Sequence, residues 1–124
     1  MQSLSRLSTC EKPLQDLFNE VVKTYDCTII CGFRDEKEQT RAFEDGRSKK
    51  KWPNSKHNKY LSSAVDVAPC PVCWNDTMRF YVFAGYVQAV ADRLDIKIRW
   101  GGRFDETKNY EHQTFKDLVH FELK

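Results

Sequence analysis

Residues 55–69 read SKHNKYLSSAVDVAP, a polar segment that leads directly into an apolar one. The first half is rich in Lys, Asn and Ser and has no hydrophobic periodicity, which is typical of a loop. Residues 64–67 are mostly small or β-branched and predict a strand that ends at Pro69. Asp66 is an acid inside that strand, and a buried acid needs a partner or a metal ion. The stretch therefore predicts a loop that brings His57 beside a strand carrying Asp66.

Residues 117–123 read DLVHFEL and supply the second half of a candidate metal site. Their composition predicts a final strand over residues 119–123, which carries His120. His57, Asp66 and His120 together offer two imidazoles and one carboxylate. This is the ligand set of a catalytic zinc ion, which takes three protein ligands and leaves the fourth position for water.

Asp117 lies three residues before His120 and is the candidate proton acceptor for that water. On an uninterrupted strand these two side chains would point to opposite faces, because successive residues alternate. We therefore expect a turn at residues 118–119 that lets Asp117 and His120 converge.

The rest of the chain predicts helices and strands in an order typical of an α+β domain. The expected elements are a helix over residues 14–25, a strand over Cys27–Cys31, a helix capped by Asp35 and Glu38 that runs to Phe43 or Glu44, a helix capped by Asn75 or Asp76 that runs to Leu94, and a strand over residues 96–100 before the Gly101-Gly102 turn. We expect a single compact domain over residues 1–124, with a small antiparallel sheet flanked by helices.

Composition is that of an ordinary globular core, with 40% apolar and 13% aromatic residues among 124. The formal net charge of +2 is too small to indicate a nucleic-acid or membrane partner. No apolar stretch approaches the roughly 20 residues of a membrane span. The first residues lack the hydrophobic region of a signal peptide, so we expect the protein to accumulate in the cytoplasm where it is made.

The five cysteines are an odd number in a chain without a signal peptide, which favours reduced thiols over a disulfide framework. Cys70 and Cys73 form a CxxC pair, but no second pair accompanies them as in a structural zinc site. We interpret them as incidental thiols, with redox or metal chemistry as the alternative. Cys31 is expected to be buried in its strand and therefore inert.

The two motifs resemble the M15 family of zinc peptidases, and most closely the phage-type L-alanyl-D-glutamate peptidases, small endolysins that cut peptidoglycan stem peptides. The resemblance rests on Ser-x-His with Ala-x-Asp at residues 55–66 and on Asp-x-x-His-Phe-Glu-Leu at residues 117–123. Residues 30–34 with Gln39, and Trp100-Gly101-Gly102, follow in the family's order. The His57-to-Asp66 spacing is longer than in the more familiar members, and Arg103 stands where an acid is common.

The resemblance implies a fold like that of the M15 and DD-peptidases, and a Zn²⁺ cofactor held by His57, Asp66 and His120. It also implies that Asp117 is the general base and that Arg34 contacts the substrate and stabilises the developing oxyanion. Gln39 and Ser55 are expected to position their neighbours or contact the substrate. The expected partners are peptidoglycan stem peptides, cut by a monomer that reaches the cell wall after its release from the host cytoplasm.

Several residues keep two interpretations. His57 could be an exposed loop residue, His120 a core histidine and Arg34 a structural ion-pair partner. Were His120 structural, His112, otherwise a surface residue, would be the substitute ligand. Two further residues are expected near the site, with a structural alternative for each: Glu122, either an acceptor for a ligand imidazole or a surface charge, and Trp100, either a cleft wall or part of the core.

Two alternative functions also stay open. The same zinc chemistry would serve a D,D-carboxypeptidase or D-Ala-D-Ala dipeptidase. The fold could also be a non-catalytic wall-binding or virion-associated module. Residues 46–60 hold six Lys or Arg and no acid, a run that is either a solvated loop or a surface that attracts an anionic polymer. This run alone is weak evidence for nucleic-acid binding, which we do not expect.

Overall fold

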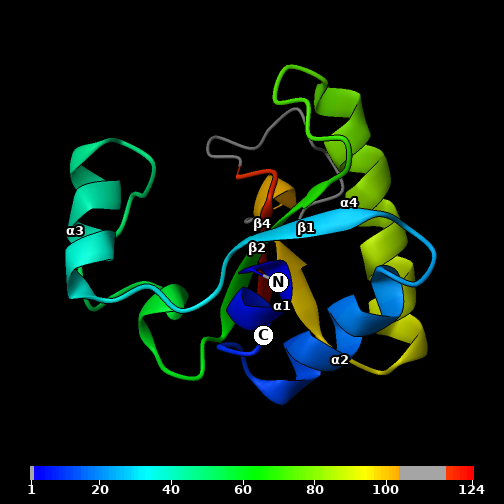
Figure 1. The fold of residues 1–124 in the computed structure, drawn as a ribbon, viewed down its shortest axis with the longest axis horizontal. Helices are drawn as coiled ribbons and strands as arrows, with labels where there is room; N and C mark the ends of the chain where they lie inside the picture. The colour runs from blue at the N-terminus through cyan, green and yellow to red at the C-terminus, as the bar shows by residue number, and fades with distance from the viewer. Residues whose placement is uncertain (1, 104–116) are drawn as a thin grey trace.

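A computed structural model describes residues 2–103 and 117–124 of the chain. Its centre is a four-stranded antiparallel sheet with the strand order β1-β2-β4-β3 (Figure 1). The strands are β1 (Cys27–Cys31), β2 (Ala64–Pro69), β3 (Ile98–Trp100) and β4 (His120–Leu123). The helices are α1 (Gln2–Leu7), α2 (Lys12–Val21), α3 (Glu36–Glu44) and α4 (Thr77–Arg93), with 3-10 turns η1 (Lys56–Asn58) and η2 (Gly101–Arg103). The predicted α+β class with an antiparallel sheet is confirmed.

The core lies between one face of the sheet and the paired helices α2 and α4. Phe121 of β4 is fully buried and meets Phe18 of α2 and Phe83 of α4 edge to face, at ring-centroid distances of 5.4 and 6.1 Å. Val65 and Val67 of β2 belong to the same cluster. Side chains alternate along a strand, so the residues between them point to the other face. That other face carries the polar residues of the site.

The helix α3 stands apart from the α2–α4 layer, on the left of Figure 1, between long connections. Asp35 caps it as predicted: its carboxylate accepts from the Glu38 N–H, and the Glu38 carboxylate accepts from the Asp35 N–H, which completes a capping box. Asp76, one of the two predicted candidates, caps α4 by accepting from the Arg79 N–H. No described helix combines the length and apolar character that a membrane crossing needs.

Several predicted boundaries were wrong, each for a local reason. The helix predicted to reach Tyr25 ends at Val21, because the N–H groups of Lys23 and Thr24 bond to carbonyls three residues back and tighten the chain. The strand predicted from Ile96 begins at Ile98, because the Ile96 N–H bonds to the Ala91 carbonyl and closes the end of α4. There, Asp95 adopts a left-handed φ of 58°.

Three smaller features of the structure also differ from the sequence-based predictions. Helix α1 was not predicted, since six residues are too few for a periodic pattern. The last strand begins at His120 rather than Val119, which belongs to the turn before it. All five cysteines are free, and Cys31 is half-buried, not buried as expected.

Candidate active site

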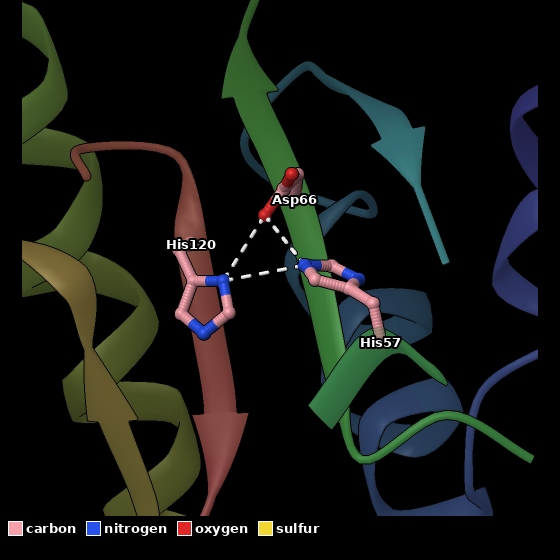
Figure 2. A group of neighbouring side chains, drawn as sticks. All are labelled: His57, Asp66 and His120. Carbon is pink, nitrogen blue, oxygen red and sulfur yellow. Dashed lines mark hydrogen bonds and ion pairs between the residues drawn. The ribbon is translucent and has the colours of Figure 1, made fainter. Parts of the chain in front are cut away.

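The two ligand candidates on the sheet are placed by strand pairing. Asp66 of β2 and His120 of β4 are direct partners in the antiparallel register, so their side chains lie side by side on the face away from the core. In Figure 2 the Asp66 carboxylate and the His120 ring converge with the ring of His57, which comes from a separate turn. Only 2% of His57 and 8% of each of the other two residues is exposed.

The third candidate, His57, is carried by η1, and Ser55 builds that turn. The Ser55 hydroxyl accepts from the His57 N–H at 3.2 Å, and the Asn58 side-chain oxygen accepts from the Ser55 N–H at 3.0 Å. This reciprocal capping box satisfies backbone donors that a short turn would otherwise leave free. The turn is also tied to the end of β1, because the Arg34 N–H donates to the His57 carbonyl at 2.8 Å.

The donor atoms of the three residues form a nearly equilateral triangle. His57 Nε2 lies 3.2 Å from Asp66 Oδ1 and 3.3 Å from His120 Nδ1, and His120 Nδ1 lies 3.3 Å from Asp66 Oδ1. Tetrahedral bonds of 2.0–2.2 Å to a zinc ion place ligand atoms about 3.3 Å apart. The donor set and its spacing therefore fit a metal ion, and the three residues form a cluster able to hold one.

The outer nitrogen of each imidazole has its own acceptor. His57 Nδ1 donates to the Gly32 carbonyl at 2.8 Å, because a carbonyl only accepts, and Nε2 therefore faces the triangle. His120 Nε2 donates to Glu122 Oε1 at 2.8 Å, which leaves Nδ1 facing inward. Such outer acceptors fix the tautomer and orientation of metal-binding imidazoles. Glu122 thus accepts a hydrogen bond from the imidazole of a candidate ligand, which is the first of its two interpretations.

The negative charge of Asp66 and the positive charges of the two histidines stabilise each other. Burial lowers the pKa of His57, but the Asp66 carboxylate outweighs it and raises this pKa to about 10. Burial likewise opposes ionisation of Asp66, yet the His57 charge and hydrogen bonds from both histidines hold its pKa well below the usual range. The His120 pKa is raised by hydrogen bonds to Asp66 and Glu122 that outweigh burial. In the metal-free protein the two imidazoles hold protons beside Asp66, and metal binding would displace these protons.

Glu122 collects positive partners behind His120. Its Oε2 lies 2.8 Å from the Arg99 guanidinium and 3.0 Å from the Lys56 ammonium, while Oε1 accepts from His120. Burial would raise the pKa of Glu122, but these hydrogen bonds, with that from His120 the strongest, hold it well below its usual range. Glu122 and Arg99 are cross-strand partners, as are Asp66 and His120. The pairing of β2, β4 and β3 thus places both the two candidate ligands and the residues that support His120.

Arg34 lies between the triangle and the loop that follows α3. Its guanidinium is 3.5 Å from Asp66 Oδ2 and donates to the Gln39 side-chain oxygen at 3.0 Å. The ion-pair interpretation and the active-site interpretation of Arg34 therefore describe the same position. Its guanidinium also lines the pocket that contains the triangle.

Gln39 is fully buried and connects Arg34 to the loop that follows α3. Its oxygen accepts from Arg34 and, at 3.0 Å, from the Asn58 side chain. Its amide nitrogen donates to the Ser48 hydroxyl at 2.9 Å and to the Lys50 carbonyl at 2.6 Å. Every hydrogen-bonding position of the amide is in use, so Gln39 positions its neighbours and has no free group for a substrate.

Asp117 is placed by the turn that the strand periodicity required. Its carbonyl accepts from the His120 N–H at 3.1 Å across residues 118–119, and its N–H donates to the Gly101 carbonyl at 3.0 Å. A Cβ at Gly101 would lie 2.1 Å from the backbone carbonyl oxygen of Asp117, so the close approach of these two backbone segments requires glycine. Burial, and then the negative charge of Asp66, raise the pKa of Asp117.

Trp100 holds the other end of this turn. The indole packs in the core at 7% exposure, edge to face with Tyr81, and its Nε1–H donates to the Leu118 carbonyl at 2.9 Å. A Cβ at Gly102 would lie 2.4 Å from the Trp100 ring. Trp100 thus has the core position that its second interpretation described, and it contacts the turn that bears Asp117.

A pocket of about 790 Å³ contains the triangle, Arg34 and Asp117. Sequence reasoning did not place Lys56, Arg99, Cys31 or Trp74 in this pocket, nor did it identify Asn58 as a buried partner of Gln39. Asn58 stands at capping-box distance from Ser55, a signal that could have found it. Cys31 lies with Sγ 4.0 Å from His57 Nδ1. His112 and the role of the Arg103 side chain lie outside the described part of the chain.

Comparisons with known proteins agree with this geometry. A family model described as phage L-alanyl-D-glutamate peptidase matches residues 1–124. The crystal structure of the Serratia marcescens L-Ala D-Glu endopeptidase ChiX superposes with a TM-score of 0.77 and 24% identity, covering 98% of this chain and 86% of that one. No curated protein matches in sequence. The fold is thus that of the Serratia enzyme, and the chain belongs to the phage L-alanyl-D-glutamate peptidase family.

Proposed function

We propose that this peptidase uses a zinc ion, held by His57, Asp66 and His120, to hydrolyse the L-Ala–D-Glu bond of peptidoglycan stem peptides. The observation that carries the zinc assignment is the donor triangle with sides of 3.2–3.3 Å. Two neutral nitrogens and one carboxylate suit zinc better than calcium or magnesium, which prefer oxygen ligands. When bound, zinc would supply Lewis acidity, which lowers the pKa of water and polarises a carbonyl.

Asp117 is the proposed general base. It lines the same pocket as the triangle without belonging to it, and burial raises the pKa of its carboxyl in the metal-free protein. In this role it accepts the proton of the attacking water and returns it to the amine of D-Glu as the bond breaks. Its place on a tight turn held by Gly101 and Trp100 limits the motion of that carboxyl.

Arg34 is the proposed electrophilic partner. The guanidinium carries five N–H donors, and its contacts with Asp66 and Gln39 do not use all of them. A fixed cationic donor beside the scissile carbonyl stabilises the oxyanion that develops there. Gln39 and Asp66 orient it, so its position is set before a substrate binds.

The test is mass spectrometry of purified stem peptides incubated with zinc-loaded protein, beside a chelated sample and Asp117→Ala. We expect cleavage between L-Ala and D-Glu in the zinc-loaded wild type alone, together with one bound zinc per chain. Loss of terminal D-Ala instead would indicate a carboxypeptidase with the same zinc site. Bound zinc without cleavage of any bond would favour a non-catalytic wall-binding module.

We also propose the biological setting that the family's phage origin supports. The protein would reach the cell wall from the host cytoplasm after release and cause lysis as an endolysin, acting as a monomer without a nucleic-acid partner. Light scattering of the purified protein tests the monomer. Lysis of outer-membrane-permeabilised cells by the wild type, but not by Asp117→Ala, tests the endolysin role.

A further inference from the structure

Cations line the pocket on more than one side, but Lys56 and Arg99 both contact the Glu122 carboxylate. Four cations from α3 and the segment after it line the pocket: Arg41, Arg47, Lys49 and Lys50. We call these four residues the cationic wall. In Figure 1, α3 and this segment lie to the left of the sheet, whereas the connection from β2 to α4, which carries Trp74, lies above it. The cationic wall therefore occupies one side of the site.

The cationic wall is anchored to the catalytic side of the pocket. Gln39 binds the Lys50 carbonyl and the Ser48 hydroxyl with its amide nitrogen, and the same amide accepts from Arg34. The N–H groups of Arg47 and Ser48 both donate to the Ala42 carbonyl, at 2.9 and 3.1 Å, which closes the end of α3. A solvated run of lysines needs no buried amide to hold it. The anchoring keeps the backbone of the wall in a fixed relation to Arg34.

Two of the four cations of the wall carry a charge without an ion-pair partner among the described residues. Over residues 2–103 and 117–124, Arg41 and Lys50 have no ion-pair partner. Arg47 contacts Asp45 at 3.1 Å, but both side chains are more than half exposed. Glu38 is the acid on this side of the pocket, and its carboxylate accepts from the Asp35 N–H. The wall can therefore attract an anionic ligand.

We propose that the cationic wall is the subsite for the carboxylate-bearing part of the substrate, on the D-Glu side of the scissile bond. This rests on the proposed function. In a stem peptide, L-Ala is joined at both ends and has no free charge. D-Glu is linked onward through its side-chain carboxyl, so its α-carboxylate stays free, and the end of the stem adds a further carboxylate. The carboxylates of the substrate thus lie on one side of the bond, as Arg41 and Lys50 lie on one side of the pocket.

This placement fixes the direction in which the peptide binds. The D-Glu side faces Arg41 and Lys50, while the L-Ala side faces away from the wall. An exposed cation–carboxylate contact contributes up to about fivefold in affinity, so two such contacts give up to about 25-fold. Such contacts weaken as salt is raised, because screening shortens the range of the attraction.

The experiment compares two substrates, a stem peptide with free carboxylates and the same peptide with its D-Glu α-carboxyl and terminal carboxyl amidated. The test variant is Arg41→Ala/Lys50→Ala. The matched control is Lys37→Ala/Lys51→Ala, which removes the same charge from α3 and its loop at positions that do not line the pocket; Lys51 lies over the Phe43 ring. The readouts are kcat/KM at low and high salt, and binding of the released D-Glu-containing fragment by calorimetry.

We expect the wild type to prefer the carboxylate substrate by about 2- to 25-fold at low salt. The test variant should lose this preference with little further loss on the amidated peptide, and the control should keep it. Equal turnover of both substrates by the wild type would overturn the subsite, as would an equal loss on both substrates in the test variant.

Fragment binding separates failure of the subsite from failure of the proposed function. If no bond is cleaved, the proposed function fails, and the wall is judged by binding alone. Tighter binding of the free fragment than of its amidated form, lost in Arg41→Ala/Lys50→Ala, supports the subsite. Equal binding of the two fragments overturns it.

Discussion

Asp66 and His120 reach the proposed metal site on paired strands, whereas His57 reaches it on a three-residue turn. The strand residues are set by the β2–β4 register, and the opposite face of the same strands packs Val65 and Phe121 into the core. The turn instead depends on side-chain hydrogen bonds. We call the first region the sheet half of the site and the second, which includes Arg34 and Gln39, the loop half.

The difference lies in how much of the fold supports each half. A slip of one residue in the β2–β4 register would turn Asp66 toward the core and Val65 toward solvent, so core packing protects the sheet half. The loop half has no comparable apolar layer, and its anchors are the capping box of Ser55 and the four hydrogen bonds of Gln39. Damage to a polar anchor should therefore displace the loop half while the sheet stays folded.

The largest effect is expected from His120→Ala in the sheet half. Loss of one ligand should remove the metal and lower kcat/KM by at least about 10⁴-fold, because the ion's charge stabilisation is worth several kcal/mol. The core should survive, since Phe121 points the other way. Zinc content by atomic emission and kcat/KM check this, with circular dichroism as the control. A variant that keeps full zinc and activity would contradict the ligand assignment.

Asp117→Asn should lower kcat by about 10²- to 10⁴-fold, the usual contribution of a general base, while zinc stays bound. In the metal-free wild type, NMR titration should find the Asp117 pKa above the ordinary 3.8, because burial and Asp66 oppose its ionisation. Zinc should then lower that pKa, since a nearby cation favours the carboxylate. Loss of zinc in the Asn variant would instead make Asp117 a ligand.

The sheet half could be foreseen from the sequence more fully than the loop half. Asp66 in an apolar strand and His120 with its alternating Glu122 are local patterns, and the strand period also required the turn before His120. The β1 bounds and the Asp35–Glu38 cap likewise follow from neighbouring residues.

The loop half depends on contacts between residues far apart in the chain. Gln39 joins Arg34, Asn58 and Lys50, and nothing near Gln39 in the sequence indicates that its amide is buried. For the same reason the six basic residues of 46–60 could not be assigned to the pocket or to solvent from their sequence alone. Ile96 was misassigned because a left-handed Asp95 turns its N–H back to α4.

Gln39→Leu should test the loop half most directly. It leaves the Asn58 amide and the Lys50 carbonyl without their buried partner, and one or two such groups cost about 2–4 kcal/mol of unfolding free energy. Urea unfolding measures this cost. Gln39→Glu is the matched control, since a carboxylate still accepts from Arg34 and Asn58 but cannot donate to the Lys50 carbonyl. Equal stability of Gln39→Leu and wild type would remove Gln39 as the anchor.

Glu122→Gln should weaken zinc binding by about 10- to 100-fold, because the ligand imidazole loses its charged acceptor. It should also change the acid stability of the metal-free protein. The folded-state pKa of Glu122 is depressed, so its stabilisation is present above the ordinary pKa of 4.5 and is lost as the pH falls. Wild-type stability should therefore fall more steeply on acidification than that of the variant. Parallel pH curves would contradict this role.

The smallest effect is expected from Ser55→Ala, which removes one cap from the loop half. Loss of the hydrogen bond from the His57 N–H should cost about 1 kcal/mol of unfolding free energy, as for other caps. The His57 ring keeps its bond to the Gly32 carbonyl, so zinc should still bind, though more weakly than in the wild type. Ser55→Thr, which keeps the hydroxyl, is the control. If Ser55→Ala binds zinc as tightly as wild type, the β1 contacts alone hold His57, and the loop half is better supported than its few polar anchors indicate.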